Sequence, residues 1–368
     1  MTPAIHQFVA GYTTRDAISN EARTLRGVFR AWGCESTIFS ESRRILPELR
    51  ADTVDIAEAT ARCRQSDVAI LHLSIGSSVN TAFAALPCRK AILYHNVTPP
   101  RYFEWVNPQT AHALALGVRQ VASLVGVAEI NLADSDFNAA ELNALGYSNV
   151  RTFPLVLDFD FIGTAPDRAT MAAFSDGRLN VLFVGRGAPN KRLEDVLAAF
   201  TCLRRHVEPH ARLILAGSFA GTEPYYAFLL SESRAAGTDS VHILGSVTQP
   251  VLSALYRSAS VFLCMSEHEG FCIPIMESMA HDVPVLAYAA AAVPDTMDGA
   301  GVLFRNKDFA SVAEMIVRLT RDRALREAVI AGQRERVKRY RQRDLDAELK
   351  TLLAPLLPTG APPQGVIR

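Results

Sequence analysis

The sequence has no excess of charge of one sign. Its 368 residues include 38 lysine and arginine residues and 38 aspartate and glutamate residues, so its formal net charge is zero. Proteins that bind nucleic acid usually carry a basic excess, and we therefore expect no nucleic acid partner. One basic stretch, RERVKRYRQR at 334–343, is a local exception. We interpret it as a solvated helix face in preference to a patch that touches the inner face of a membrane.

Long hydrophobic runs and paired cysteines are also missing. No uninterrupted apolar run approaches the 18 residues of a membrane span, and the first residues, MTPAIHQFVAGYTT, do not form a basic region followed by an apolar core. The six cysteines, at 34, 63, 88, 202, 264 and 272, form no CxxC pair and no metal-ligand spacing. We expect a cytoplasmic protein that is neither secreted nor membrane-spanning, with peripheral membrane contact as a second possibility.

Two common nucleotide motifs are absent as well, and no Asp-x-Asp metal motif lies beside the residues that are proposed below to bind phosphate. The sequence contains no Walker A pattern, and no G-x-G-x-x-G follows a strand, so ATP hydrolysis and a conventional NAD site have no motif to support them. The nearest Asp-x-Asp pattern is DFD at 158–160, within a stretch from 155 to 177 that is rich in turn and breaker residues. We expect no cofactor and no metal ion at the active site.

The sequence does contain short apolar runs that alternate with helical patterns. In the first half, such runs lie at 5–12, 67–76, 90–99 and 129–135, with helical spacing over 16–33 and 138–147. In the second half, five runs lie at 179–185, 211–217, 241–247, 260–266 and 283–288, with helical patterns over 193–206, 249–259 and about 308–356. This alternation predicts βαβ units and parallel sheets with helices on both faces. The fold class is therefore α/β, with two Rossmann-like, doubly wound domains facing an inter-domain cleft.

The domain boundaries follow from these patterns. We predict a first domain over residues 1–165 and a second over 166–335, with a linker within 155–177. A helix over 336–356 is predicted to pack back toward the first domain. Residues 357–368, PTGAPPQGVIR with the preceding leucine, have the composition of a disordered tail.

The stretch SEHEGFCIPIMESMAHDVP, residues 266–284, places two carboxylates around a predicted helix start. Proline is favoured at the first helical position, so Pro274 predicts that Glu269 lies in a loop and Glu277 in the first helical turn. The loop follows an apolar strand, and the carboxyl ends of parallel strands are where such sheets bind ligands. The alternative is a partly solvated acidic turn.

Cationic residues follow the first strand of the second half. Arg186 comes after Gly185, and Lys191 is predicted at the start of the next helix with Asn190 as its cap. Cations at a helix amino terminus oppose its dipole, so Lys191 and Arg192 are unfavourable there unless they hold an anion such as phosphate. The alternative is that both side chains extend into water.

The order of these signals resembles the retaining glycosyltransferases of family 4, which have the GT-B architecture. The resemblance depends on Gly185-Arg186, Lys191 five residues later, and E-x7-E at Glu269 and Glu277, supported by LILAGS and VPVLAY. It covers nearly all of the second half. The first half is similar more loosely, through DAISNEARTLR, ILYHNVTPP and ADSDFNAAELNALGY.

The resemblance implies a role for each matching residue. Arg186 and Lys191 would hold the diphosphate of a sugar nucleotide, Glu269 would contact the donor sugar, and Glu277 would hold the ribose. His95 would lie near the reacting sugar. The implied donor site also includes the residues Gly11, Gly185, Gly217, Gly270, Phe271, Cys272 and Ile273.

One position departs from the family pattern. The family usually has E-G-F-G, whereas this sequence has Cys272 in place of the second glycine. A cysteine fits there only if the position needs neither a positive φ nor a bare backbone.

The function implied is transfer of a hexose from a nucleotide diphosphate sugar to a glycan or lipid-linked acceptor, in bacterial-type surface polysaccharide synthesis. Two alternatives remain open. One is a sugar-nucleotide epimerase of the same architecture, which would isomerise the donor without an acceptor. The other is a catalytically silent protein that only binds the sugar nucleotide.

Overall fold

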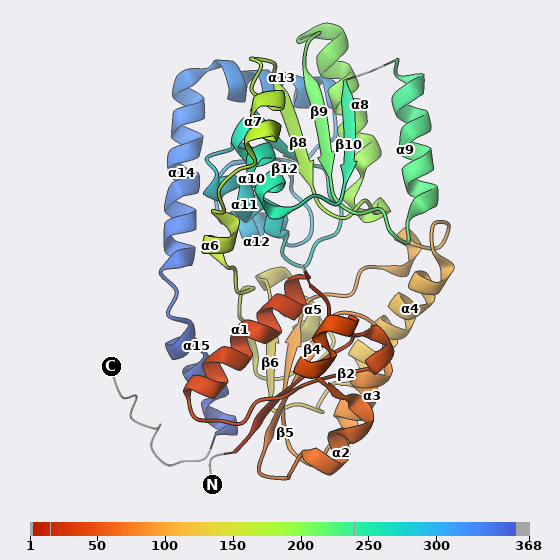
Figure 1. Ribbon diagram of the computed structural model, residues 1–368, viewed down its shortest axis with the longest axis vertical. Coiled ribbons are helices and arrows are strands. Elements are labelled where there is room, and N and C mark those ends of the chain that lie inside the picture. Colours follow the sequence, from red (N-terminus) through yellow and green to blue (C-terminus); the bar gives the residue numbers. More distant parts are fainter. Residues whose placement is uncertain (1–2, 15, 238–239, 358–368) are drawn as a thin grey trace. The chain divides into compact units, whose positions relative to one another are not determined.

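The computed structural model describes residues 3–14, 16–237 and 240–357, which form two compact units (Figure 1). The first unit comprises Met1–Pro100, Gln109–Leu157 and Arg343–Arg368, and the second comprises Arg101–Pro108 and Asp158–Gln342. The tail predicted over 357–368 lies, from residue 358 on, outside the described residues. Among the described residues, no helix has both the length and the hydrophobicity that a membrane span requires.

The first unit is built on a seven-stranded sheet in the order β3-β2-β1-β4-β5-β6-β7, in which every pairing is parallel. Its strands are β1 (Ile5–Val9), β2 (Ile38–Ser40), β3 (Val54–Asp55), β4 (Val68–Leu73), β5 (Arg89–Tyr94), β6 (Ile130–Ala133) and β7 (Val150–Thr152). Its helices are α1 (Ala17–Ala31), α2 (Ala59–Arg62), α3 (Ser78–Ala85), α4 (Pro108–Ser123), α5 (Asp136–Ala144) and α15 (Leu345–Leu353).

The second unit is built on a six-stranded sheet in the order β10-β9-β8-β11-β12-β13, again parallel throughout. Its strands are β8 (Asn180–Val184), β9 (Arg212–Ala216), β10 (Val241–Gly245), β11 (Val261–Cys264), β12 (Val285–Tyr288) and β13 (Val302–Phe304). Its helices are α6 (Phe159–Ile162), α7 (Arg168–Phe174), α8 (Leu193–His206), α9 (Glu223–Ala235), α10 (Gln249–Ser258), α11 (Ile273–Ala280), α12 (Val293–Met297), α13 (Phe309–Arg321) and α14 (Arg323–Arg341). The two sheets confirm the predicted class of two Rossmann-like, doubly wound domains.

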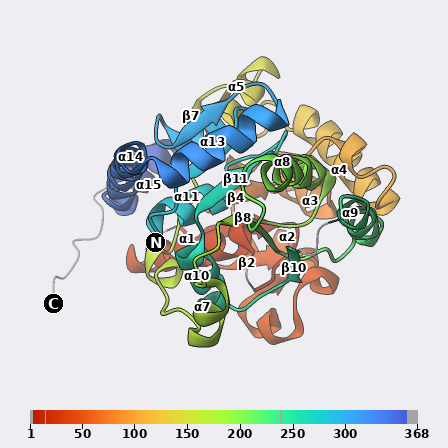
Figure 2. The ribbon, with the colours of Figure 1, turned by 90° about the horizontal axis from the view of Figure 1, so that it is seen from above.

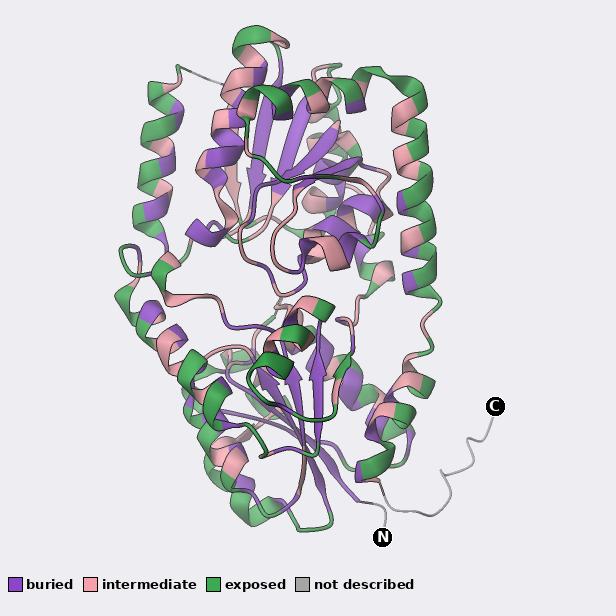
Figure 3. Cartoon of the chain, turned by 180° about the vertical axis from the view of Figure 1, so that it is seen from behind, coloured by how far each residue is buried: buried purple, intermediate pink, exposed green. Residues whose placement is uncertain are grey.

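Helix α8 illustrates why these segments form the elements they do. Its buried apolar residues, Leu193, Val196, Leu197, Phe200 and Leu203, recur at the three- and four-residue spacing of one helix face. Glu194 and Asp195 in the first turn and Arg204 and Arg205 in the last turn complement the helix dipole. Figure 3 shows the same division elsewhere, with buried strands and exposed outer helix faces. Each fully buried Leu or Phe side chain contributes roughly 1.5–3 kcal/mol to folding.

Helices cover both faces of the second sheet. Helix α13 packs against α8, and α10 packs against α7. Seen from above, these two pairs lie on opposite sides of β8 (Figure 2). Helices α6 and α7 lie within the stretch 155–177 that the sequence predicted as a linker, so that stretch is partly helical.

The last described helix belongs to the core of the first unit. Leu349 and Leu353 of α15 are buried in the same apolar cluster as Leu25 and Phe29 of α1. The indole Nε1 of Trp32 donates a 2.5 Å hydrogen bond to Asp346 Oδ1, which fixes α15 beside α1.

Each sheet has a point at which the direction of strand addition reverses. In the first unit the reversal lies between β1 and β4, and in the second it lies between β8 and β11. Loops after the carboxyl ends of strands at such a reversal are where doubly wound sheets bind ligands. These loops carry most of the residues that the sequence singled out.

Candidate functional site

In the second unit, the loops after β8 and β9 approach each other closely. Gly185 follows β8 and Gly217 follows β9, with φ values of 149° and 150°, which favour glycine. A Cβ atom added at Gly217 would lie 1.8 Å from the carbonyl oxygen of Gly185. Glycine at 217 is therefore required by packing between the two loops, whatever ligand binds there.

Arg186 extends from the β8 loop over neighbouring elements of the same unit. Its Nη2 donates a 3.3 Å hydrogen bond to the carbonyl oxygen of Ala220, and its guanidinium lies 5.8 Å from the centre of the Phe103 ring. The residue as a whole is exposed. Arg186 is thus loosely held and keeps hydrogen-bond donors available for an anion.

Lys191 does not occupy the helix start that the sequence predicted. It ends a 3₁₀ turn over Pro189–Lys191, and α8 begins two residues later, after Arg192 in a left-handed conformation with φ 52°. Asn190 is not the cap of α8; its side-chain Nδ2 donates a 3.0 Å hydrogen bond to the carbonyl oxygen of His268. The prediction of Asn190 as a cap is therefore wrong, because the chain makes a tight turn before the helix begins.

Carboxylates offset the cations at this turn. Lys191 Nζ lies 2.5 Å from Glu269 Oε2, and the two side chains are 20% and 8% exposed. Burial opposes the charge of Lys191, but the nearby Glu269 carboxylate raises its pKa overall. The Lys191 side chain therefore does not simply extend into water, because its ammonium group pairs with the Glu269 carboxylate.

A second group of ion pairs surrounds the same turn. Arg192 pairs with Glu194 at 2.8 Å, Asp195 at 3.1 Å and Glu267 at 3.3 Å. Lys307 Nζ bridges Asp195 and Glu267 at 2.7 and 3.0 Å. These bonds anchor the turn after β8 to the loop after β11.

The loop after β11 carries Glu269, Gly270, Phe271 and Cys272. Cys272 has φ 74°, so this position adopts the positive φ that a cysteine disfavours, and the condition stated from the sequence is not met. A non-glycine residue in this region costs roughly 1–2 kcal/mol. The loop is held by hydrogen bonds at its backbone, because Thr296 Oγ1 donates to the Phe271 carbonyl oxygen and the Ala292 N–H donates to that of Glu269.

Helix α11 begins at Ile273, which makes Pro274 its second residue. Glu277 is consequently at the start of the second turn, one position later than predicted. Tyr256 Oη donates a 2.6 Å hydrogen bond to Glu277 Oε2, and the Tyr256 ring stacks on His281. Burial raises the pKa of Glu277. The Glu277 carboxylate is therefore oriented by a neighbouring phenol.

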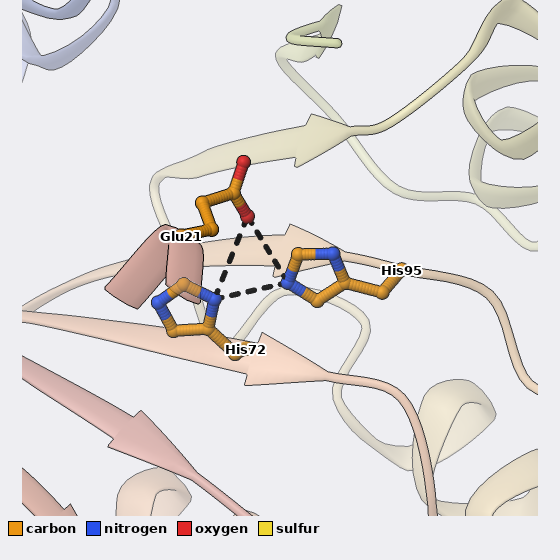
Figure 4. A group of neighbouring side chains, drawn as sticks. All are labelled: Glu21, His72 and His95. Atoms are coloured by element: carbon orange, nitrogen blue, oxygen red, sulfur yellow. Dashed lines mark hydrogen bonds and ion pairs between the residues drawn. The ribbon is translucent and has the colours of Figure 1, made fainter. Parts of the chain in front are cut away.

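In the first unit, polar groups gather where β4, β5 and β6 end. His72 Nδ1 lies 2.9 Å from His95 Nε2, and His95 Nδ1 lies 2.9 Å from Asp134 Oδ2. Glu21 Oε2, from α1, lies 3.9 Å from His72 Nδ1 and 3.6 Å from His95 Nε2 (Figure 4). The four side chains are at most 2% exposed. We call Glu21, His72, His95 and Asp134 the buried cluster.

The buried cluster strongly perturbs its members. Burial opposes a charge on His95, yet the carboxylates of Asp134 and Glu21 raise its pKa to about 9. Burial and the neighbouring Asp134 carboxylate raise the pKa of Glu21 to about 7, although His95 acts in the opposite direction. Both ring nitrogens of His95 are already engaged within the first unit.

The sequence missed most of this cluster. Only His95 was singled out; His72 was left without a role, and Glu21 and Asp134 were not considered. A signal was present, because Glu21 precedes Leu25 by four residues and so lies on the apolar stripe of its helix. An acidic residue in a buried stripe usually has a partner.

Gly11 follows β1 in the first unit. A Cβ atom added there would come no closer than 3.6 Å to another atom, the carbonyl oxygen of Arg44. Packing within the first unit therefore gives no reason for glycine at this position.

Residues 171–344, just under half of the chain, match the family model described as Glycosyl transferases group 1. The chain is 27% identical over 220 residues to the O-antigen chain mannosyltransferase B of Escherichia coli, a match that covers 58% of this chain and 57% of that protein. It is 30% identical over 155 residues to the GDP-mannose:cellobiosyl-diphosphopolyprenol alpha-mannosyltransferase of Xanthomonas oryzae pv. oryzae, which covers 40% of this chain and 39% of that one. The matches thus span roughly half of these relatives or less.

The solved structure of Anabaena HepE in complex with UDP and glucose is similar over 96% of this chain and 98% of that chain, with a TM-score of 0.71 and 13% identity. At this identity the likeness shows the fold alone. Together with the two parallel sheets, it shows that the chain has the GT-B fold, as the sequence predicted.

Proposed function

We propose that the protein is a retaining glycosyltransferase of the family 4 type, which transfers a hexose from a nucleotide diphosphate sugar to a glycan or lipid-linked saccharide in surface polysaccharide synthesis. The observation that carries the proposal is the Lys191–Glu269 pair, held between the loops after β8 and β11 within the region that matches the glycosyltransferase model. A cation and a carboxylate at this sheet edge suit the diphosphate and the hydroxyl groups of one ligand.

In this proposal the second unit binds the donor. Arg186 and Lys191 hold the diphosphate and stabilise the charge that grows on it as its bond to the sugar breaks. Glu269 accepts hydrogen bonds from the sugar hydroxyls, and Glu277 accepts them from the ribose. The positive end of the α11 dipole adds to the attraction for the same anion, although Pro274 has no N–H and the Ile275 N–H donates a 3.1 Å hydrogen bond to the Cys272 carbonyl oxygen. The remaining donor contacts are assigned to Gly185, Gly217, Gly270, Phe271, Cys272 and Ile273.

Donor binding has to rearrange the Lys191–Glu269 pair. The Lys191 ammonium and the Glu269 carboxylate form an ion pair, and both side chains are mostly buried. A diphosphate offers Lys191 a stronger anionic partner, which frees Glu269 to accept from the sugar. The pair therefore keeps both groups neutralised until the donor is present.

From the first unit, we assign Gly11 to a close approach of the diphosphate and His95 to the reacting sugar. Because both ring nitrogens of His95 are engaged, its contact with the reacting sugar is made through the backbone at the end of β5. Asn96, the next residue, has φ 75° and redirects the chain there.

The proposal includes three further points. No metal ion is needed at the diphosphate, since two cations already serve it. Nucleic acid is not a partner. Any membrane contact is peripheral, at the inner face, through exposed cations of α14 such as Arg334 and Lys338, whose side chains are 65% and 61% exposed.

GDP-mannose is the first donor to test, because both relatives described above are named as mannosyltransferases. UDP- and dTDP-hexoses complete the donor panel, each offered with polyprenyl-diphosphate saccharides. We expect one donor to give a new glycoside with the anomeric configuration of the donor, measured by NMR, without added Mg²⁺ or Mn²⁺. The comparisons do not favour an epimerase. Isomerised donor in the absence of acceptor would nevertheless establish that activity, and donor binding without turnover by any acceptor would indicate a silent binding protein.

A further inference from the structure

The buried cluster of the first unit has an arrangement that the proposed glycosyl transfer does not use. Three of its possible ligand atoms, His72 Nδ1, His95 Nε2 and Glu21 Oε2, lie within 4.8 Å of one another (Figure 4). Glu21 Oε2 accepts no hydrogen bond from any described residue, although its side chain is 0% exposed. The other oxygen, Oε1, accepts a 2.9 Å hydrogen bond from the Val156 N–H. One buried carboxylate oxygen is therefore aimed at two ring nitrogens without a proton donor of its own.

The outer nitrogens of both histidines already have acceptors. His72 Nε2 lies 3.0 Å from Gln7 Oε1, and His95 Nδ1 lies 2.9 Å from Asp134 Oδ2. An amide oxygen and a carboxylate both accept, so the ring protons belong on these outer nitrogens. His72 Nδ1 and His95 Nε2, 2.9 Å apart, then leave one position between them, which either a second proton on His95 or a metal ion bound by both lone pairs can occupy. Metal-bound histidines show this pattern, with the outer N–H held by an amide or carboxylate oxygen.

The cluster also buries two carboxylates. Arg343 acts on Glu21 electrostatically, but it already forms a 2.7 Å ion pair with Glu348. Two carboxylates taken out of water need about two positive charges beside them. These charges can come from two protons or from one divalent cation.

We propose that the buried cluster binds a divalent transition-metal ion, with zinc as the ion to test first, through His72 Nδ1, His95 Nε2 and Glu21 Oε2. The three atoms are 2.9, 3.6 and 3.9 Å apart. A triangle with these sides has a point about 2.0 Å from every corner, which is the usual zinc–nitrogen and zinc–oxygen distance. Two imidazoles and one carboxylate suit zinc or iron(II) better than magnesium or calcium.

The ion would join three elements of the first unit. His72 belongs to β4, His95 follows β5 and Glu21 belongs to α1. An ion that binds only the folded unit stabilises it in proportion to the logarithm of its free concentration. The site is distinct from the diphosphate site proposed in the second unit, and it does not depend on the proposed function.

The test measures zinc in the full-length chain. Wild-type protein, stripped with a chelator and dialysed against ZnSO₄, is expected to hold one zinc ion per chain and to unfold at a higher temperature than the stripped form. Glu21→Gln keeps the shape and the bond from Val156 but removes the charge. We expect it to weaken zinc binding by more than the roughly 10–100-fold that losing an outer partner costs. Gln7→Met removes the outer partner of His72, and its zinc affinity should be lower than that of the wild type by a factor within that range.

Two controls separate this site from others. His6→Gln removes a buried histidine from β1, outside the cluster, and should keep the zinc. Cys264, Glu269 and Cys272 form a second group of ligand atoms in the other unit, so Cys264→Ser should also leave binding by the first unit intact. The proposal is overturned if stripped wild-type protein takes up no zinc, or if Glu21→Gln binds it as tightly as wild type. Zinc lost in Cys264→Ser but kept in Glu21→Gln would place the ion in the second unit and overturn it as well.

Discussion

The two units differ in where their backbones are strained. In the first unit, the described non-glycine residues with left-handed backbone are Asn96 and Asn149, and asparagine tolerates that conformation. In the second unit the described non-glycine residues with left-handed backbone include Arg192, Cys272 and Ala291, and these residue types do not tolerate that conformation well. All three lie close in sequence to the Lys191–Glu269 pair or to a residue that contacts it. Arg192 follows Lys191, and Cys272 lies three residues after Glu269. Ala291 precedes Ala292, whose N–H donates a hydrogen bond to the Glu269 carbonyl oxygen.

The difference indicates that the two units contain different kinds of locally unfavourable structure, namely strained backbone in the second unit and buried charge in the first. The strained residues of the second unit surround one ion pair, and such strain persists where the surrounding structure fixes a site. The first unit instead concentrates buried charge behind its strand ends, held by hydrogen bonds. We expect changes at the strained loops to affect ligand binding and turnover, and changes in the first unit to affect stability.

The largest effect is expected from the cations of the second unit. Lys191→Ala and Arg186→Ala should each lower transfer activity by about 10² or more, because each removes charge at the departing diphosphate. Turnover is measured with the donor found in the panel. Arg323→Ala is the control, since the Arg323 side chain is 89% exposed and forms an ion pair with Glu327 on the same helix, α14. Normal turnover in folded Lys191→Ala would contradict the expectation that changes at the strained loops of the second unit affect turnover.

Tyr256→Phe tests the donor site of the second unit by removing a single oxygen atom, the hydroxyl group that bonds Glu277. Without the 2.6 Å hydrogen bond, Glu277 is less well oriented toward the ribose. Hydrogen bonds to charged groups contribute roughly 1.5–3 kcal/mol, so we expect KM for the donor to rise by about tenfold or more while kcat changes little. Steady-state kinetics at fixed acceptor measures this. A fall in kcat with an unchanged KM would contradict the assignment of Glu277 to nucleotide binding.

A stability effect is expected from Glu41 in the first unit. Burial opposes its charge, but hydrogen bonds from Arg43 and Ser78 lower its pKa below its ordinary 4.5. A carboxylate with a lowered pKa stabilises the fold above 4.5 and loses that contribution as the pH falls through its folded-state pKa. Glu41→Gln should therefore lower the unfolding free energy by about 1–2 kcal/mol at pH 7 and by much less at pH 3. Denaturant unfolding at both pH values tests this, and an equal loss at both would exclude the ionised contribution.

The smallest effect is expected from relief of strain. Ala291→Gly removes the cost of φ 48° and should stabilise the protein by about 0.5 kcal/mol, after allowing for the greater freedom of glycine when unfolded. Ala347→Gly, in α15 of the first unit, is the matched control. It should destabilise by roughly 0.5–1 kcal/mol because the residue is helical. The same sign at both positions would mean that Ala291 is not strained.

The sequence predicted the central strands and several helices because their apolar runs are long. The run at 193–206, for example, coincides with α8. It did not predict β2, β3, β7 or β13, because strands of two or three residues carry no readable period.

The candidate site was predictable in its residue types but not in its pairings. Spacing placed Lys191 and Glu269 near one sheet edge. Their direct contact, however, depends on the left-handed turn at Arg192, which the residue types around that position do not predict. The positive φ of Cys272 was unpredictable for the same reason, since tertiary contacts override local preference. The buried cluster was missed because it joins four segments between residues 21 and 134.

The most direct test of the donor site is calorimetric titration of UDP, GDP and dTDP into wild-type protein and Lys191→Ala. We predict that one nucleotide binds the wild-type protein at a single site and binds Lys191→Ala at least about 100-fold more weakly, whereas Arg323→Ala binds it normally. If none of the three binds, or if Lys191→Ala binds as tightly as wild type, then the Lys191–Glu269 pair is not the diphosphate site.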